Sequence, residues 1–164
     1  MHIELDDLTP PQVHALLEEH LANMHELSPR ESVHALDLAK LRTLDITFWT
    51  VWESATLLGC GALKGPTATH GEVKSMRTPQ ALRGRGAGPA VLTHIIDTAR
   101  SRGYRRLSLE TGAHAAFLPA QTLYASFGFT ECGPFAGYAH DPNSVFMTLT
   151  LRTAVQDPEH SPWQ

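Results

Sequence analysis

The chain has 164 residues, 42% of them hydrophobic, which is the size of one domain with a substantial core. Charged residues make up 18% and the formal net charge is −4, which excludes a strongly basic surface for nucleic acid or an anionic membrane and agrees better with a cationic substrate. Cys60 and Cys132 are too few for a disulfide framework or a zinc site, and no leader or membrane-spanning apolar run is seen, so we expect a reduced, cytoplasmic, soluble protein.

The first 44 residues predict a short strand and two helices. Ile3 and Leu5 alternate with polar neighbours, as in a strand. Thr9-Pro10-Pro11 is typical of a helix start, and apolar residues three and four apart predict a helix to about Met24 with one buried face. After Ser28-Pro29, a second helix is predicted over 30–44, with the apolar positions Val33, Leu36, Leu38 and Leu41.

The middle of the chain predicts a hairpin followed by a β-α-β unit. β-branched and aromatic residues predict strands over 45–52 and 56–63. A strand over 72–78 then leads into a glycine-rich loop, residues 83–88, and the helix after this loop ends at Gly103. A strand over 106–110 completes the unit, which requires parallel pairing and a right-handed crossover.

The last third of the chain predicts a helix over 116–127 and strands over 129–132 and 145–151, the last two separated by a long loop. We therefore expect a layered α/β fold with a single domain over residues 1–152. Residues 153–164 contain two prolines and mixed charge, which predicts a flexible tail.

The glycine-rich loop is the strongest chemical signal in the sequence. Three glycines in five residues let the backbone bend tightly, so that successive N–H groups can point at one anion, and the following helix adds its free amides and positive dipole end. Arg83 and Arg85 add positive charge at the rim. Neither a P-loop nor a dinucleotide fingerprint fits, because Pro89-Ala90 follows the last glycine. The alternative to a pyrophosphate site is a turn that only caps a helix.

Histidine provides no comparable signal for a metal. The ten histidines are scattered from His2 to His160, and none forms a His-Glu-x-x-His pair. We therefore expect no catalytic metal.

The spacing Arg83-x-x-Gly86-x-Gly88 resembles the acetyl-coenzyme A signature of the GNAT superfamily of N-acetyltransferases. A second motif, Ala120-x-x-Leu123-Tyr124-x-x-x-Gly128-Phe129, is similar to a later helix element of the same superfamily, although Phe117 stands where that element has Asn. The resemblance extends to about Leu151. It implies a mixed, mostly antiparallel sheet with a central pair of parallel, splayed strands, flanked by helices.

The resemblance also implies acetyl-CoA as cosubstrate and gives the residues that would hold it. The main chain of Met76, Arg77 and Thr78 would bind the pantetheine arm. The pyrophosphate would lie on the glycine-rich loop, formed by Arg83, Gly84, Arg85, Gly86, Ala87 and Gly88.

Two side chains are candidates for proton transfer. The resemblance places Tyr124 beside the coenzyme sulfur, where a phenol protonated at neutral pH can donate to the departing thiolate; the alternative is that Tyr124 only fills the core. Glu72 is the candidate general base, since some relatives use a glutamate here, or else an anchor for the substrate ammonium. Strand alternation puts Glu72, Lys74 and Met76 on one face and Val73, Ser75 and Arg77 on the other, so Lys74 can hold Glu72 ionised.

In the family, the N-terminal helices and the final hairpin surround the acceptor. The candidates for an acceptor pocket are therefore His25, Glu26, Ser28, His34, Asp37, Lys74, Thr111, Tyr138 and Asp141.

The leading hypothesis for function is acetyl transfer from acetyl-CoA to a primary amine of a small molecule, with no nucleic-acid or membrane partner. The alternatives are acetylation of a protein lysine or N-terminus, a non-catalytic acyl-CoA-binding module, and a phosphate-binding module unrelated to coenzyme A. A homodimer could form through strand edges near 145–151.

Overall fold

The computed structural model describes residues 1–34 and 37–152 and contains one seven-stranded sheet. The strand order is β1-β2-β3-β4-β5-β7-β6, and every neighbouring pair is antiparallel except β4 and β5. This confirms the mixed, mostly antiparallel sheet and its parallel pair. The strands are β1 (His2–Leu5), β2 (Ile46–Glu53), β3 (Thr56–Lys64), β4 (His70–Arg77), β5 (Arg106–Gly112), β6 (Thr130–Cys132) and β7 (Ser144–Thr150).

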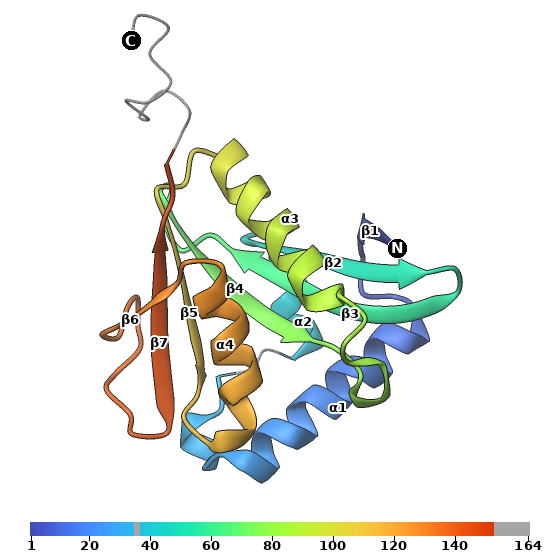
Figure 1. Cartoon of the computed structure of the whole chain (residues 1–164), viewed down its shortest axis with the longest axis horizontal. Coiled ribbons are helices and arrows are strands. Elements are labelled where there is room, and N and C mark those ends of the chain that lie inside the picture. The colour runs from blue at the N-terminus through green and yellow to red at the C-terminus, as the bar shows by residue number, and fades with distance from the viewer. Residues whose placement is uncertain (35–36, 153–164) are drawn as a thin grey trace, which may run out of the picture.

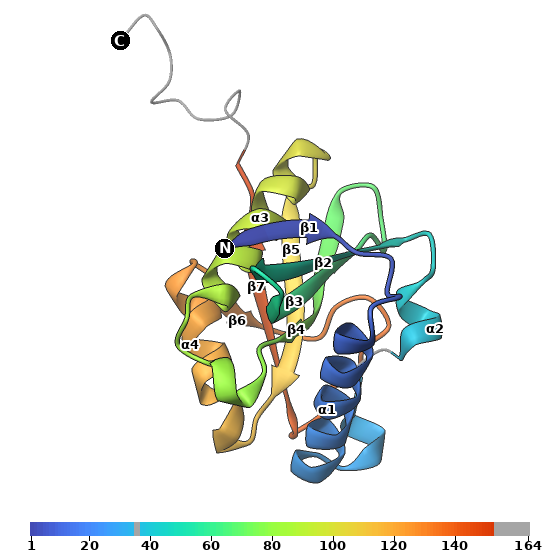
Figure 2. The same cartoon turned by 90° about the vertical axis from the view of Figure 1, so that its right-hand side faces the viewer.

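Helices cover both faces of the sheet (Figures 1 and 2). Helices α3 (Ala87–Ser101) and α4 (Leu118–Ser126) pack on one face, where Val91, Leu92 and Ile95 of α3 are buried against the sheet. Helices α1 (Pro11–Leu27) and α2 (Leu38–Leu41) cover the other face through a second core that includes Val13, Leu16 and Leu41. Short 3₁₀ turns precede α2, α3 and α4, at Arg30–Ser32, Gln80–Leu82 and Ala115–Phe117.

The predicted helix over 30–44 is wrong. A 3₁₀ turn at Arg30–Ser32 is followed by Val33 in an extended conformation, with φ −90° and ψ 112°. The next helix among the described residues begins at Leu38, and the Asp37 side chain caps it by accepting from the Lys40 amide. The apolar positions do not keep a helical period across this stretch, and Ser32 instead forms a distant hydrogen bond to Asp141 at 2.5 Å.

Strands β4 and β5 separate along their length. Their parallel ladder contains only the pairs His70 with Arg106, Gly71 with Leu107 and Glu72 with Ser108. Beyond this point β4 continues along β3 and β5 continues along β7, and Figure 1 shows the two strands diverging. The expected splay is therefore present, and backbone groups of both strands face the gap between them.

A bulge in β4 overturns the predicted alternation. Ser75 has a φ of 54°, and the register with β3 jumps from Ala62–Lys74 to Cys60–Arg77. Because the bulge adds a residue to β4, the side chains after it change faces. Met76 lies under α3, where a Cβ on Gly61 would come within 2.8 Å of its sulfur. Arg77 points to the α1 face.

The expectation of an open edge near 145–151 is wrong for the middle of β7. Residues 146–148 pair with β5 on one side and with β6 on the other, so the outer strands of the sheet are β1 and β6. The predicted tail at 153–164 lies outside the described residues. Within residues 1–34 and 37–152, no helix has the length and apolar character needed to cross a bilayer.

Candidate active site

A cavity of about 810 Å³ opens where β4 and β5 separate. Its walls come from β4, from the end of β5, from α1 and α4, and from the loop before α3. The sheet therefore brings the glycine-rich loop, Tyr124 and Glu72 to one cavity, as expected from the sequence.

The glycine-rich loop lines this cavity, and its backbone amides have no partner among the described residues. Within the described part of the chain, the amides of residues 83–88 form no hydrogen bond, and Gly86, the N-cap of α3, has no side-chain cap. Gly84 and Gly86 have φ values of 81° and 85°, where other residues are strained. A Cβ would meet nothing within 4 Å at Gly84, so its conformation, rather than crowding, requires glycine there.

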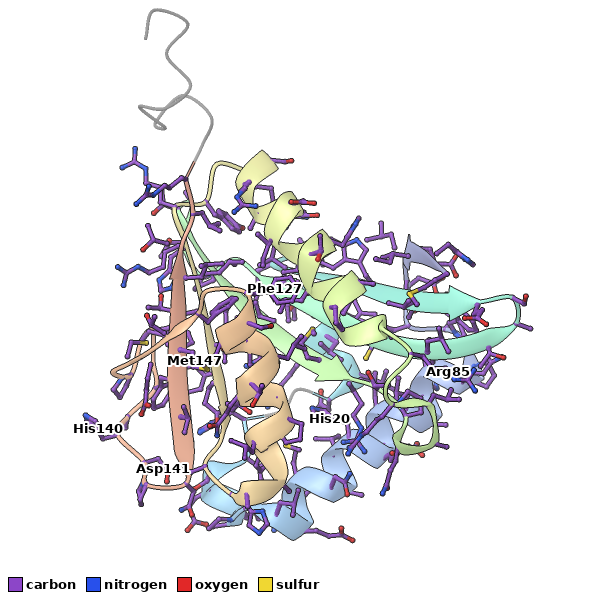
Figure 3. All side chains as sticks on the ribbon, in the orientation of Figure 1. His20, Arg85, Phe127, His140, Asp141 and Met147 are labelled. Carbon is purple, nitrogen blue, oxygen red and sulfur yellow. The ribbon has the colours of Figure 1, made fainter. Side chains whose placement is uncertain are left out.

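The arginines of the loop lie at the rim of the cavity. Arg83 and Arg85 are exposed, and Figure 3 shows Arg85 on the loop that enters α3. Free amides, the positive end of a 15-residue helix and two arginines together fit a pyrophosphate.

The residues at the end of β4 line the cavity, and one of their side chains also holds α1 in place. Met76, Arg77 and Thr78 all line the cavity. The Arg77 side chain is only 7% exposed and donates to Glu19 on α1 at 2.7 Å, and the Asn23 amide, oriented with its oxygen toward Arg77, accepts a further hydrogen bond. The side chain of Arg77 thus fastens α1 to β4.

His20 is a cavity-lining residue that sequence reasoning missed. It lies on α1 (Figure 3), and its Nδ1 is buried without a hydrogen-bond partner. Burial and the nearby Arg77 charge lower its pKa to about 4, so the ring is neutral at pH 7. No periodic signal separates such a histidine from the other nine.

Glu72, Lys74 and Tyr138 form a buried polar cluster at the other end of the cavity. Glu72 Oε2 lies 3.2 Å from Lys74 Nζ and accepts from the Tyr138 hydroxyl at 2.5 Å, and Lys74 Nζ lies 2.8 Å from the same hydroxyl. The exposed fractions of the two charged side chains are 5% and 8%. Burial and the charge of Glu72 raise the pKa of Tyr138, which keeps its proton. The predicted pairing of Lys74 with Glu72 is confirmed.

Tyr124 combines packing with access to the cavity. Its ring is buried in the core under α4, in an edge contact with Phe129 at 5.9 Å between centroids. It also lines the cavity, and its hydroxyl has no hydrogen-bond partner among the described residues. Burial, and secondly the charge of Glu110, raise the pKa of Tyr124, so the phenol remains protonated.

Glu110 is a second carboxylate in the cavity that sequence reasoning missed. It ends the polar face of β5, two residues after Ser108, whereas Leu107 and Leu109 point into the core under α3. Burial raises the pKa of Glu110 to about 7. The signal was available, because Glu72 and Glu110 lie on neighbouring parallel strands and Glu110 shares a face with Ser108, the partner of Glu72.

The acceptor-pocket candidates divide into two groups. Ser28, His34, Lys74 and Thr111 line the cavity. Tyr138 reaches it through Glu72, and its ring packs edge-on against His34 with centroids 5.0 Å apart. His25, Glu26 and Asp37 do not line the cavity: the first two are exposed on α1, and Asp37 caps α2.

Asp141 has a positional role. It lies on the loop before β7 (Figure 3) and accepts from Ser32, a cavity-lining residue of the 3₁₀ turn after α1. This hydrogen bond and those from Asn143 lower the pKa of Asp141. The bond joins the loop over 133–143 to the wall of the cavity.

Phe117, which replaces the family's asparagine, closes the end of β5. A Cβ added to Gly112 would come within 2.2 Å of the Phe117 ring. Gln121 of α4 donates to the Gly112 carbonyl at 2.9 Å, so an amide is present one helical turn away. Among the residues that the structure describes, no group of three or more potential ligands could hold a metal ion.

Comparison with known proteins identifies the family of the chain. The model of the acetyltransferase (GNAT) family matches residues 13–129. The Bacillus subtilis protein named uncharacterized N-acetyltransferase YsnE is 58% identical over 151 residues, covering 92% of this chain and 100% of that protein. A protein of Azospirillum brasilense named IAA acetyltransferase is 42% identical over 137 residues, covering 83% of this chain and 88% of the relative.

Solved structures have the same fold. The crystal structure of a Klebsiella pneumoniae protein named as an acyl-CoA N-acyltransferase is 28% identical, with a TM-score of 0.78. The alignment covers 92% of this chain and 97% of the other. A Bacillus subtilis acetyltransferase in complex with CoA is 18% identical with a TM-score of 0.66, covering 92% and 99% of the two chains. At that lower identity the likeness concerns the fold alone.

Proposed function

The chain belongs to the acetyltransferase (GNAT) family and is an N-acetyltransferase, and from this premise we propose that it transfers the acetyl group of acetyl-CoA to the primary amine of a small molecule. The observation that carries the proposal is one continuous cavity, which runs from the free amides of residues 83–88 to the buried cluster around Glu72.

Acetyl-CoA fits this cavity by charge and by backbone chemistry. The amides of the glycine-rich loop and Arg83 and Arg85 would hold the pyrophosphate. The pantetheine arm would follow the gap between β4 and β5, where Met76, Arg77 and Thr78 line the cavity and could offer it their main-chain groups. The CoA in the Bacillus subtilis acetyltransferase complex supports the same class of ligand.

The chemistry is a direct displacement. The neutral amine attacks the thioester carbonyl carbon, the C–N bond forms, and the C–S bond breaks as the carbonyl reforms. The thiolate takes a proton from the Tyr124 hydroxyl, which is free to donate, and the tyrosinate recovers a proton from the acetylated nitrogen. The enzyme otherwise contributes the alignment of the two reactants.

A small acceptor is favoured over a protein because the acceptor end of the cavity is walled. Ser32, Val33 and His34 line it, and the loop before β7 is held against this wall by Asp141. The name of the Azospirillum brasilense relative also supports a small acceptor.

Two measurements test the proposal. Titration calorimetry should show acetyl-CoA binding, and a thiol-release assay should then find turnover with one or more members of a panel of monoamines, diamines, amino acids and amino sugars. A lysine peptide and an N-terminal peptide belong in the same panel. Turnover with the peptides alone would assign a protein acceptor, and binding without thiol release from any amine would mean a non-catalytic module.

A further inference from the structure

The two carboxylates that line the cavity, Glu72 and Glu110, differ in position and in their partners. Glu72 belongs to the last β4–β5 pair, with Ser108, and Glu110 follows Ser108 by two residues on the same face of the sheet. Glu110 therefore lies just beyond the point where the strands separate, on the wall opposite the continuing β4, and it lines the cavity.

Glu72 is already committed to protein groups. Its Oε2 contacts Lys74 at 3.2 Å and accepts from Tyr138 at 2.5 Å, and its side chain is 5% exposed. To remove a proton from a substrate, it would have to give up a buried ion pair, which is costly. Glu110 forms no ion pair with any cation in the described part of the chain.

From this contrast, and on the basis of the proposed function, we infer that Glu110, rather than Glu72, binds the ammonium of the acceptor and takes its proton. The proton moves from the ammonium to a Glu110 oxygen, which leaves a neutral amine beside the thioester and a neutral carboxylic acid. Glu110 then releases the proton to solvent after CoA and the acetylated amine depart. In this proposal Glu72, Lys74 and Tyr138 have a structural role: their mutual contacts fix the shape of this end of the cavity.

The protonation behaviour of Glu110 suits this role. A carboxyl with a pKa of about 7 in place of 4.5 accepts a proton from an ammonium about 300-fold more favourably. The transfer also helps the acid step, because the charge of Glu110 raises the pKa of Tyr124, and neutralising Glu110 removes that effect. One proton transfer thus prepares the amine and makes the Tyr124 hydroxyl a better donor.

Several charged or titratable groups face Glu110 and enter its pH dependence. Glu72 and Asp141 raise its pKa and Lys74 lowers it, while Tyr124 and Tyr138 have pKa values that Glu110 itself raises. From β4, α4 and the loop before β7, the full set is Glu72, Lys74, Tyr124, Tyr138 and Asp141.

The inference predicts a bell-shaped profile of kcat/KM against pH for the most active amine of the panel. The ascending limb, near pH 7, comes from ionisation of Glu110, and the descending limb comes from the pKa of the amine, because the ammonium is the form that binds. Glu110→Gln cannot remove the proton of the ammonium, so only amine that is already neutral in solution can react. Its kcat/KM should therefore rise with pH toward the amine pKa without a descending limb. Its rate at pH 7 should fall at least about 100-fold.

Three further variants make the experiment decisive. Glu131→Gln, on the exposed edge strand β6, removes the same charge and should keep the bell-shaped profile of kcat/KM against pH. Glu110→Asp should keep the bell at a lower rate. Glu72→Gln should keep the ascending limb near pH 7. Acetyl-CoA calorimetry on each variant shows that the donor site is intact.

The results separate the inference from the proposed function. If Glu110→Gln binds acetyl-CoA and keeps the wild-type profile, the inference is wrong while the function stands, and loss of the ascending limb in Glu72→Gln alone would assign the base to Glu72. If the wild-type protein releases no thiol with any amine, the proposed function fails and takes this inference with it.

Discussion

Tyr124 belongs to the core and also lines the cavity. Its ring packs against Phe129, while its hydroxyl faces the cavity with no partner in the described part of the chain. The two alternatives considered from the sequence, core filler and acid, are therefore compatible in geometry, and only the hydroxyl separates them.

Tyr124→Phe should lower kcat about 100-fold, because the thiolate loses its proton donor. The free energy of unfolding should change by less than about 1 kcal/mol, because no internal hydrogen bond is lost. Steady-state kinetics and urea unfolding measure the two quantities. An unchanged kcat would leave Tyr124 with a packing role only.

Glu110 also makes stability depend on pH. Its folded pKa of about 7 lies above the ordinary 4.5, so the folded state holds this proton more tightly than the unfolded chain. The resulting stabilisation is complete below pH 4.5 and is lost as the pH rises through 7.

The difference in free energy of unfolding between Glu110→Gln and the wild-type protein should therefore shift in favour of the variant as the pH rises from about 5 to about 8. The expected shift is on the order of 2 kcal/mol. Urea unfolding at both pH values tests this, with Glu131→Gln as the control for net charge. A gap that does not widen with pH would show that the Glu110 carboxyl has an ordinary pKa.

At the scale of elements, the glycine-rich loop and the N-terminus of α3 depend on backbone conformation. Gly86 and Gly103 lie at opposite ends of α3 with nearly equal φ values, 85° and 81°, and neither has a neighbour that a Cβ would strike. The chain thus contains a matched pair of left-handed glycines, one at the site and one far from it in the sequence.

Gly86→Ala and Gly103→Ala should each cost about 1–2 kcal/mol of stability, since both place a Cβ in the left-handed region. Only Gly86→Ala should weaken acetyl-CoA binding, because its strain reorients the amides of the loop. Calorimetry compares the two variants. Equal affinities of the two variants for acetyl-CoA would show that the loop does not bind the coenzyme.

Local signals predicted some elements well and others poorly. The glycine-rich loop, the parallel unit around it and the Lys74–Glu72 pair follow from short-range patterns, and the structure contains all three. The predicted helix over 30–44 is interrupted by extended backbone at Val33, next to Ser32, whose side chain binds Asp141, 109 positions away. The alternation of β4 failed at the bulge of Ser75, a residue type with no special preference for positive φ.

At the scale of the whole molecule, the end of the cavity proposed for the acceptor is assembled from distant segments. The loop before β7 supplies Tyr138 to Glu72 and Asp141 to Ser32, contacts that span 66 and 109 positions of the chain. No single-sequence pattern links such segments, which is why Tyr138 could be named as a candidate while its partner Glu72 could not be assigned to it.

Breaking the contact between Asp141 and Ser32 should loosen the wall of the acceptor pocket. Asp141→Ala should raise KM for the amine several-fold while the affinity for acetyl-CoA stays unchanged, because the glycine-rich loop is not involved. Asp97→Ala, exposed on α3, is the matched control. Equal KM values in the two variants would show that this wall does not contact the acceptor.

The end of the cavity proposed for the donor is lined by the main-chain amides and arginines of the glycine-rich loop, whereas the end proposed for the acceptor is lined by side chains of the turn after α1, which the loop before β7 holds in place. Mutation replaces side chains but leaves peptide groups in place. Evolution or directed engineering could therefore diversify which amine is acetylated through substitutions in those two segments, with the acetyl source inherited unaltered.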